Sequence, residues 1–415
     1  MQTPNKKKTR LVVFDVEGVL IPKNRFFFEV GKSIGILPLL KILTIGFLYE
    51  IGVITLKSGL KRIFCNIRGV KIERLQQIFE RIPSTPNLQS VFAQLKTRNC
   101  KMALISSGLP TIIVKKLAAT LGADYAFGIE VGVNDGELTG EIWGDVIDSN
   151  GKFRVLWQIL TAEKLSLNDC VIVADDRNNR SLFRPEMQKI GYNPDFVLRI
   201  KADNVVTGKF SGILPIIDGK SKQRSLPSRH AVLRESIHAS GFFVPILGGL
   251  AGVPVVAAAI CVVIALYVVS EFLRMSGKNL PVISAITRNA ASQSELNEFA
   301  AAPLYFAVGI LVTLLLFPRP ISGAAIAMFA LGDSTASILG GRISKKSLPF
   351  NKSKTIEGSL SGFFFAFLAG SLFFIPPLYA LFGAAIAMII EYLPLPVNDN
   401  VLVPVFTGLA LTLII

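Results

Sequence analysis

The sequence predicts two folds in one chain: a doubly wound α/β domain, then an all-α, polytopic membrane domain of about seven transmembrane helices. Residues 1–235 mix charged and apolar residues as soluble domains do, whereas residues 237–415 contain charge-free runs of about 17–25 residues, the length that spans a bilayer. In the first part, short apolar runs ending in polar clusters alternate with helix-like stretches. We place the first domain at 1–218, a basic linker at 219–236 and the membrane domain at 237–415.

The composition limits the classes of function. The 415 residues carry a net charge of +15, yet 51% of them are hydrophobic. A soluble nucleic-acid binder rarely combines these properties, whereas a membrane protein with basic cytoplasmic segments does. The basic N-terminal segment, MQTPNKKKTR, precedes a short strand-like run and lacks the longer apolar region of a signal peptide. We therefore expect an integral, multi-pass membrane protein with a cytoplasmic first domain and no nucleic-acid partner.

Three short apolar runs, Leu11–Val16, Met102–Ser106 and Val171–Ala174, are typical of buried parallel strands. Helix-like stretches lie between them, for example Asn87–Thr97 and Thr111–Leu121. Because ligands of such sheets bind at the carboxyl ends of strands, we expect the polar clusters at the ends of the three runs to form one site. These clusters are Asp15-Val16-Glu17, Ser106-Ser107-Gly108 and Asp175-Asp176.

This order of motifs resembles the haloacid dehalogenase superfamily, most closely its phosphoserine-phosphatase-like branch, over about residues 10–215. The resemblance implies a Mg²⁺-dependent phosphatase that acts on a phosphorylated substrate of unknown identity, with a helical cap inserted at about 19–100. Asp15 would accept the phosphoryl group and bind the metal, since Mg²⁺ screens the repulsion between two anions. Glu17 would protonate the leaving oxygen and take part in the metal site.

The same resemblance assigns the remaining groups of this site. Lys152, in SNGKFRVL, matches the lysine that neutralises the transferring phosphoryl group. The Ser106-Ser107-Gly108 turn would bind that group, and Asp175-Asp176 would complete the metal site. Two positions depart from the family pattern: Glu17 replaces an Asp, and Asn179 stands where this branch has a further Asp. A domain that binds a phosphorylated ligand without turnover therefore stays open beside an active phosphatase.

The cap contains an unusually apolar stretch, Ile34–Thr55, interrupted by Lys41 and Glu50. A buried pair of cap helices and a surface that enters the membrane interface both fit this pattern.

The membrane half is predicted from its charge distribution. Two crossings are expected between Ile237 and Leu273, because the segments on either side are both basic and so both face inside. Single crossings follow at about 300–317, 321–340, 358–375, 377–393 and 400–415. The polar stretch Leu331–Leu360 then lies on the cytoplasmic side, as the first domain does. An arrangement of six crossings stays open.

Within that stretch, GDSTASILGGRI and KSKTIEGSLSGF resemble the CTP-dependent lipid kinases, a family that includes dolichol kinase, phytol kinase and the fungal diacylglycerol kinase. The resemblance covers about residues 234–415, with further matches at Arg234…His238, Glu271…Arg274 and Glu391…Asn400. It implies CTP as the phosphoryl donor and a membrane lipid alcohol as the acceptor.

A carboxylate near the inner end of a span is costly unless it is paired or binds a cation, so we assign Asp333 to Mg²⁺–CTP. Gly340 lets the backbone approach the phosphates. Asp399 is a second metal ligand or the base that activates the lipid hydroxyl. His238 contacts lipid phosphate or simply packs. The other predicted nucleotide contacts are Lys345, Lys346, Lys354, Thr355 and Glu357, although Lys345 and Lys346 also suit a purely topological role.

Together these features predict a bifunctional membrane enzyme: a CTP-dependent kinase for a lipid alcohol of polyprenol or dolichol type, joined to a Mg²⁺-dependent phosphatase. One alternative is a cytidylyltransferase that forms a CDP-lipid. Another is a lipid kinase regulated by a non-catalytic, phosphate-sensing domain, and a third is a transporter.

Overall fold

The structure is a computed structural model that describes residues 9–50, 53–219, 229–275, 277–290, 299–343, 348, 351, 354–373, 376–393, 395 and 397–415. The chain forms two compact units, 1–222 and 223–415. This division lies close to the predicted linker. Residues 220–228 of that linker, and Lys345 and Lys346, lie outside the described residues.

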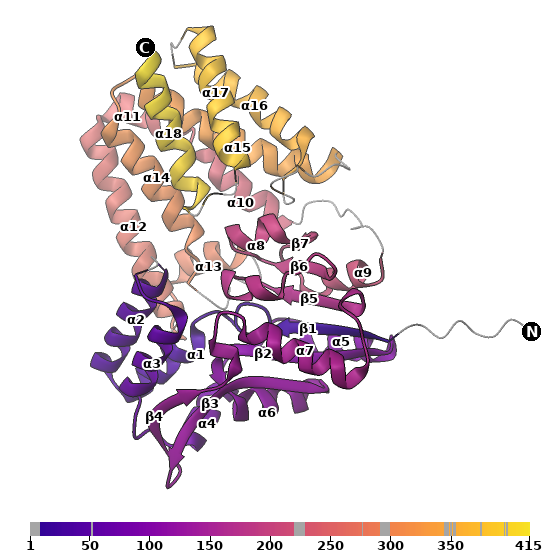
Figure 1. The fold of residues 1–415 in the computed structure, drawn as a ribbon. Helices are drawn as coiled ribbons and strands as arrows, with labels where there is room; N and C mark the ends of the chain where they lie inside the picture. The colour runs from indigo at the N-terminus through magenta and orange to yellow at the C-terminus, as the bar shows by residue number, and fades with distance from the viewer. Residues whose placement is uncertain are drawn as a thin grey trace, which may run out of the picture. The chain divides into compact units, whose positions relative to one another are not determined.

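The first unit is built on a seven-stranded sheet with the strand order β4-β3-β2-β1-β5-β6-β7 (Figure 1). The central strand β1 (Arg10–Asp15) pairs in parallel with β2 (Cys100–Pro110) and β5 (Cys170–Ala174), so the predicted α/β fold is confirmed. Only β4 runs antiparallel to its neighbour. The remaining strands are β3 (Tyr125–Asn134), β4 (Glu137–Trp143), β6 (Gln188–Tyr192) and β7 (Asn204–Val206).

Burial explains why these strands read as continuous apolar runs. Leu11, Val12, Val13 and Phe14 of β1 are all inaccessible to solvent, although successive side chains point to opposite faces. A strand buried on both faces needs helices on both faces of its sheet. Those helices are α5 (Leu88–Thr97), α6 (Thr111–Leu121), α7 (Gly151–Glu163), α8 (Phe196–Lys201) and α9 (Ile213–Ile217).

The cap is shorter than expected. It consists of α1 (Arg25–Ile34), α2 (Ile36–Glu50), α3 (Leu56–Asn66) and α4 (Ile72–Glu80). Helix α5 packs against the sheet, because the ring centroid of Phe92 on α5 lies 4.8 Å from that of Phe14 on β1. Thr85 joins the two ends of the cap: its N–H donates to the Leu20 carbonyl at 2.9 Å and its hydroxyl to the Val19 carbonyl at 2.8 Å. The cap therefore ends before α5 and not near residue 100.

Helix α2 exposes an apolar face. Ile36, Leu37 and Phe47 are 75%, 70% and 63% exposed, whereas Ile42 on the opposite side is 4% exposed. The expectation of a buried helix pair is therefore wrong for this stretch. A role at a membrane interface stays a prediction.

The second unit is helical. Two helices among the described residues are long and apolar enough to cross a membrane, at Val253–Met275 and Ile321–Gly340. Four further helices described in this unit are apolar but shorter. Seven crossings therefore stay a prediction. The helices are α10 (Arg229–Ser240), α11 (Phe243–Ala251), α12 (Val253–Met275), α13 (Pro281–Ala290), α14 (Ala302–Leu316), α15 (Ile321–Ile343), α16 (Ile356–Ser371), α17 (Pro377–Tyr392) and α18 (Asp399–Ile414).

The region expected to hold the first two crossings contains one long helix. Helix α11 has nine residues, and at about 1.5 Å per residue it is too short to cross roughly 30 Å of hydrocarbon. The chain breaks at Gly252, whose φ of +93° ends α11 before α12 begins.

Helix α15 packs closely on α16 through glycines. A Cβ at Gly362 would lie 2.8 Å from the Gly332 carbonyl oxygen, and a Cβ at Gly340 would lie 3.2 Å from the Gly358 Cα. Small residues at such positions let two helix backbones approach each other. This packing holds the C-terminal half of α15, which begins near Asp333, beside the first half of α16.

Candidate functional site

The first cluster of functional side chains lies at the carboxyl ends of β1, β2 and β5. Asp15 is the last residue of β1, and its Cα partner on β2 is Ile105, directly before Ser106. Asp175 directly follows β5. The parallel register therefore brings together the three clusters that the sequence singled out.

Asp15 is held by three protein groups. Its Oδ1 accepts hydrogen bonds from Lys152 Nζ at 2.8 Å and from the Val16 N–H at 3.0 Å, and its Oδ2 accepts one from Asn179 Nδ2. Lys152 also donates to Asn179 Oδ1 at 2.7 Å. All three side chains are buried, so the carboxylate is compensated and fixed in orientation.

Asn179 has a clear place in this network. Its amide donates to Asp15 and, at 3.1 Å, to Asp176 Oδ1, while its carbonyl accepts from Lys152. An Asp has no N–H to donate at these two points. Asn179 therefore makes hydrogen bonds that the Asp of the family pattern cannot make.

Glu17 is anchored by the end of β2. Its Oε2 accepts from Ser106 Oγ at 2.9 Å and from the Gly108 N–H at 3.2 Å. Burial, followed by the negative charge of Asp15, raises the pKa of Glu17 to about 7. A Cβ on Gly108 would lie 2.2 Å from Glu17 Oε1, so only glycine leaves room for this carboxyl group. The raised pKa suits a proton donor.

Three carboxylates form a candidate Mg²⁺ site. Oxygens of Asp15, Asp175 and Asp176 lie within 4.8 Å of one another. Asp175 Oδ1 is buried and accepts no hydrogen bond from the described residues. Carboxylate oxygens are the ligands that Mg²⁺ prefers, so the donor set fits that ion. Glu17, which we also expected at the metal, lies outside this trio because its carboxylate faces Ser106 and Gly108.

The two serines have protein partners. Ser106 Oγ donates to Glu17, and Ser107 Oγ donates to the Val146 carbonyl at 3.0 Å. Their predicted contact with a phosphoryl group therefore stays a prediction.

The sequence did not single out two residues that complete the site. Lys23 Nζ lies 2.9 Å from Asp176 Oδ2. Tyr49 of α2 donates its hydroxyl to Asn178 Oδ1 at 2.5 Å and so links the cap to the loop after β5. The local sequence gives no signal for these residues. Lys23 follows a turn and Tyr49 lies near the end of an apolar helix, and neither position belongs to a motif.

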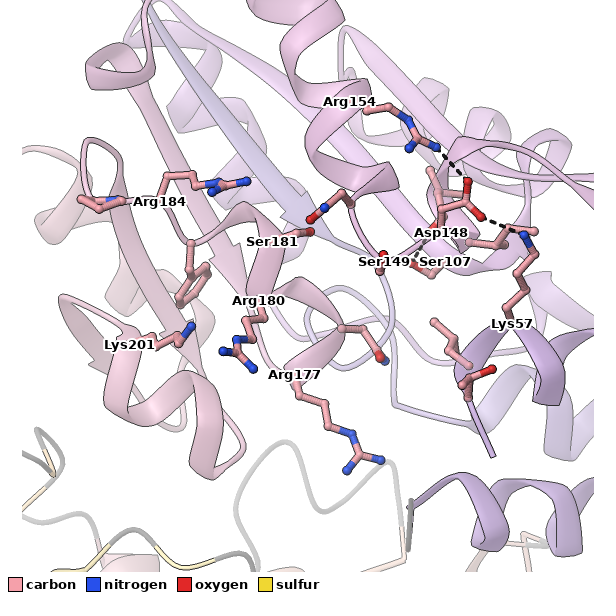
Figure 2. Close-up of a pocket in the computed structure, with 18 residues that line it drawn as sticks. Lys57, Ser107, Asp148, Ser149, Arg154, Arg177, Arg180, Ser181, Arg184 and Lys201 are labelled. Carbon is pink, nitrogen blue, oxygen red and sulfur yellow. Dashed lines mark hydrogen bonds and ion pairs between the residues drawn. The ribbon is translucent and has the colours of Figure 1, made fainter. Parts of the chain in front are cut away.

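Beside this site lies a cationic pocket of about 900 Å³ (Figure 2). Ser107 and Asn178 line both this pocket and the cleft that contains Asp15. Asp148 is the one acid among the described residues that line it, and it pairs with two of the six cations. Partial burial and the charge of Arg180 lower the pKa of Lys201. The cations are Lys57, Arg154, Arg177, Arg180, Arg184 and Lys201.

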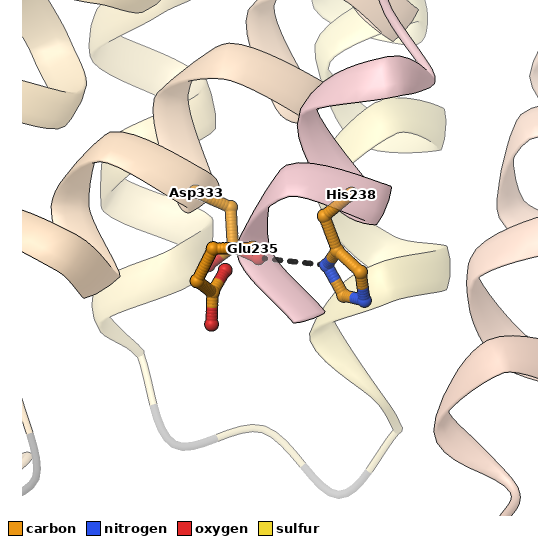
Figure 3. Close-up of side chains that lie close together, drawn as sticks. All are labelled: Glu235, His238 and Asp333. Carbon is orange, nitrogen blue, oxygen red and sulfur yellow. Dashed lines mark ion pairs between the residues drawn. The ribbon is translucent and has the colours of Figure 1, made fainter. Parts of the chain in front are cut away.

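The second cluster lies in the helical unit, around Asp333 of α15. Lys354, just before α16, places its Nζ 3.6 Å from Asp333 Oδ1 and 2.5 Å from Glu391 Oε1. His238 Nδ1 lies 3.6 Å from Asp333 Oδ2 (Figure 3). Glu235, one turn before His238 on α10, faces the same point. The structure thus joins the predicted Asp333 and Lys354, and adds Glu235, which the sequence did not single out.

Other predicted nucleotide contacts have structural partners. Thr355 Oγ1 accepts from the Gly358 N–H at 3.2 Å, which caps α16, and donates to the Gly340 carbonyl at 3.3 Å. Glu357 lies in the first turn of α16, and Asp399 in the first turn of α18. Their nucleotide-binding roles stay predictions.

Asn398 is the N-cap residue of α18. Its side-chain oxygen accepts from the Asn400 N–H at 3.0 Å, and Asn is among the residues favoured at this position. Asn398 therefore has a structural role at the start of α18.

Comparison with known proteins separates the two halves of the chain. Residues 12–184 match the family of haloacid dehalogenase-like hydrolases. The chain is 30% identical to the phosphoserine phosphatase of Methanocaldococcus jannaschii over 198 residues, which are 48% of this chain and 92% of that protein. A solved phospho-aspartyl intermediate analogue of phosphoserine phosphatase is 27% identical, with a TM-score of 0.46, and covers 52% of this chain and 100% of that one.

The C-terminal region has different relatives. The chain is 32% identical over 153 residues to a probable chloroplastic phytol kinase of Oryza sativa subsp. japonica, covering 32% of this chain and 48% of that protein. A probable phytol kinase of Glycine max is 28% identical and is covered to 51%. The chain therefore spans about half the length of these plant relatives.

Proposed function

The chain belongs, through its N-terminal half, to the haloacid dehalogenase-like hydrolases of phosphoserine-phosphatase type, and from this premise we propose a Mg²⁺-dependent phosphatase joined to a CTP-dependent lipid kinase. The observation that carries the first activity is the buried pairing of Asp15 with Lys152, beside a carboxyl group that is suited to donate a proton. These are the groups that phosphomonoester hydrolysis needs.

In the proposed mechanism, Asp15 Oδ attacks phosphorus and the bond to the substrate's leaving oxygen breaks. Glu17 gives its proton to that oxygen. Water then attacks the aspartyl phosphate, Glu17 takes the water proton, and Asp15 is regenerated with release of inorganic phosphate. Lys152 holds Asp15 in position throughout. Asp15, Asp175 and Asp176 would hold Mg²⁺, which would screen the negative charge on the phosphoryl group.

The cationic pocket supports a substrate with an additional anionic group. Arg180 and Lys201 have no carboxylate within 4.0 Å among the described residues, and their charges repel each other. An anion placed between them relieves that repulsion. Because Ser107 and Asn178 line both the pocket and the Asp15 cleft, one ligand can occupy both. We therefore favour a phosphomonoester that carries a second phosphate or carboxylate.

The second activity rests on the Asp333–Lys354–Glu391 cluster in the unit that contains the candidate membrane spans. Carboxylates within apolar helices are costly unless they are paired or bind a cation. This cluster therefore suits the metal ion that accompanies a nucleotide phosphate, with Lys354 beside it. CTP as the donor, a polyprenol or dolichol as the acceptor, seven crossings and a cytoplasmic location of both sites are parts of the proposal.

The test uses the purified full chain in detergent with CTP labelled at the γ-phosphate. We expect label to appear in one member of a panel of polyprenol, phytol and diacylglycerol, with release of CDP. Labelled pyrophosphate in place of CDP indicates a cytidylyltransferase and contradicts the proposal. In parallel, release of phosphate from p-nitrophenyl phosphate, with and without Mg²⁺, tests the phosphatase half. A folded protein without this activity contradicts that half and supports a sensor.

A further inference from the structure

A trio of potential metal ligands converges in the helical unit. One ligand atom from each of Glu235, His238 and Asp333 can be chosen so that all lie within 4.8 Å of one another (Figure 3). Glu235 and His238 lie three residues apart on α10 and so share one face, which packs against Asp333 of α15. Glu235 and His238 are 4% and 9% exposed. The three side chains therefore enclose a small, buried and polar point.

Two ligand atoms of the trio lack a hydrogen-bond partner among the described residues. Glu235 Oε2 and His238 Nδ1 are buried and make no hydrogen bond within the described ranges. A buried polar group left in this state destabilises the fold. Glu271, a buried carboxylate in the same unit, shows the opposite: Arg274 and the Ala300 N–H bind its two oxygens. The unit can satisfy a buried carboxylate, so the open atoms of the trio point to a ligand.

The first unit offers a parallel. Its unpartnered carboxylate oxygen, Asp175 Oδ1, belongs to the trio of carboxylates whose donor set fits Mg²⁺. The unpartnered oxygen of Glu235 lies in the same way within a trio of ligand atoms. In each unit, a buried carboxylate oxygen without a hydrogen-bond donor thus belongs to a trio of potential metal ligands.

The local charge also calls for a cation. Among the described residues, four carboxylates gather here, those of Glu235, Asp333, Glu391 and Asp399, and the cationic side chains that pair with them are Arg234 and Lys354. This excess of carboxylates favours a divalent cation. Lys354 does not block it, because Nζ lies beside Asp333 Oδ1 while Oδ2 faces His238.

We propose that Glu235, His238 and Asp333 form a protein-held site for a divalent first-row transition metal ion. One imidazole and two carboxylates are a donor set typical of such ions, whereas Mg²⁺ prefers oxygen alone. Phe306 stacks on His238 with a centroid distance of 4.4 Å, which restrains the ring. This proposal rests on the proposed kinase function, to which it adds a second ion beside the one that accompanies CTP. It does not require nucleotide, so binding and catalysis are tested separately.

The test measures Mn²⁺ binding by the full chain in detergent without nucleotide. The protein carries Asp15→Asn and Asp175→Asn, which remove two of the three carboxylates of the candidate metal site in the first unit. We expect one bound Mn²⁺ per chain by electron paramagnetic resonance. Spin-echo modulation from a coordinated imidazole nitrogen should appear in the same sample. Absence of nucleotide-independent binding in a protein with native helicity by circular dichroism overturns the proposal.

The chain contains two histidines, which provides a matched control. The nitrogen modulation should disappear in His238→Gln and persist in His230→Gln, since His230 is exposed and outside the trio. Glu235→Gln should weaken Mn²⁺ binding at least about tenfold. It also serves as the second variant if His238→Gln does not fold. Persistence of the modulation in a folded His238→Gln overturns the proposal, whatever the kinase assay shows.

Discussion

The two units satisfy buried carboxylates in different ways. In the first unit, backbone N–H groups of the strand-end loops bind them: Val16 to Asp15, Gly108 to Glu17 and Asn178 to Asp176. In the second unit, Glu235, Asp333 and Glu391 lie on helices, where interior N–H groups are already used by the helix. Side chains pair with these carboxylates instead: Arg234 with Glu235, and Lys354 with Asp333 and Glu391. The sheet edge therefore uses its own backbone to hold carboxylates, while the helical site relies on side chains.

The comparison predicts two sites that fail independently. Asp15→Asn removes the nucleophile, so phosphatase activity should fall by about 10³-fold or more. Transfer of label from CTP should be unchanged, because the two sites belong to different units. Phosphate release and lipid labelling are measured on the same preparation. Loss of both activities in a folded protein contradicts the independence of the sites.

The converse variant is Asp333→Asn. It keeps the shape of the side chain but removes the charge that faces Lys354 and His238. Lipid labelling should fall by about 10²–10³-fold, the usual cost of losing one electrostatic group at a transition state. Phosphatase activity of the same sample is the control. Unchanged lipid labelling would remove Asp333 from the kinase site.

A smaller effect tests the network around Asp15. Asn179→Asp replaces two donated hydrogen bonds with a negative charge beside Asp15 and Asp176, so the first unit should lose about 1–3 kcal/mol of stability. Thermal inactivation of the phosphatase measures this loss. Asn134→Asp, on an exposed hairpin, should change stability by less than about 0.5 kcal/mol. A gain in phosphatase activity with Asn179→Asp would instead show that Asn179 is a defect of the site.

The smallest effect concerns the cationic pocket. Lys201→Gln should raise KM for a substrate with two anionic groups by up to about fivefold, since exposed ion pairs contribute about 0.2–1 kcal/mol. The KM for p-nitrophenyl phosphate, which has one anionic group, should not change. Equal effects on both substrates contradict a role for the pocket in selecting a second anion.

Much of the first site was predictable from sequence. Asp15 ends β1, Asp175 follows β5, and Ser106 lies in β2 directly after its last pair with β1. Paired parallel segments end at the same edge of a sheet, so the convergence of these residues follows from the strand pattern. The pattern does not fix which atoms bind each other. The Asn179 bridge and the pairing of Lys23 with Asp176 depend on how the loop after β5 and the start of the cap fold over the sheet.

In the second unit the sequence determined less. It identified Asp333 as a costly charge near a membrane boundary and Lys354 as a nearby cation. Only the tertiary structure decided that Glu235, His238 and Glu391 surround them. The physical reason is that apolar helices show little periodic contrast between their faces. Which helices pack together is decided by close contacts such as those of Gly340 and Gly362, and these contacts join residues far apart in the chain.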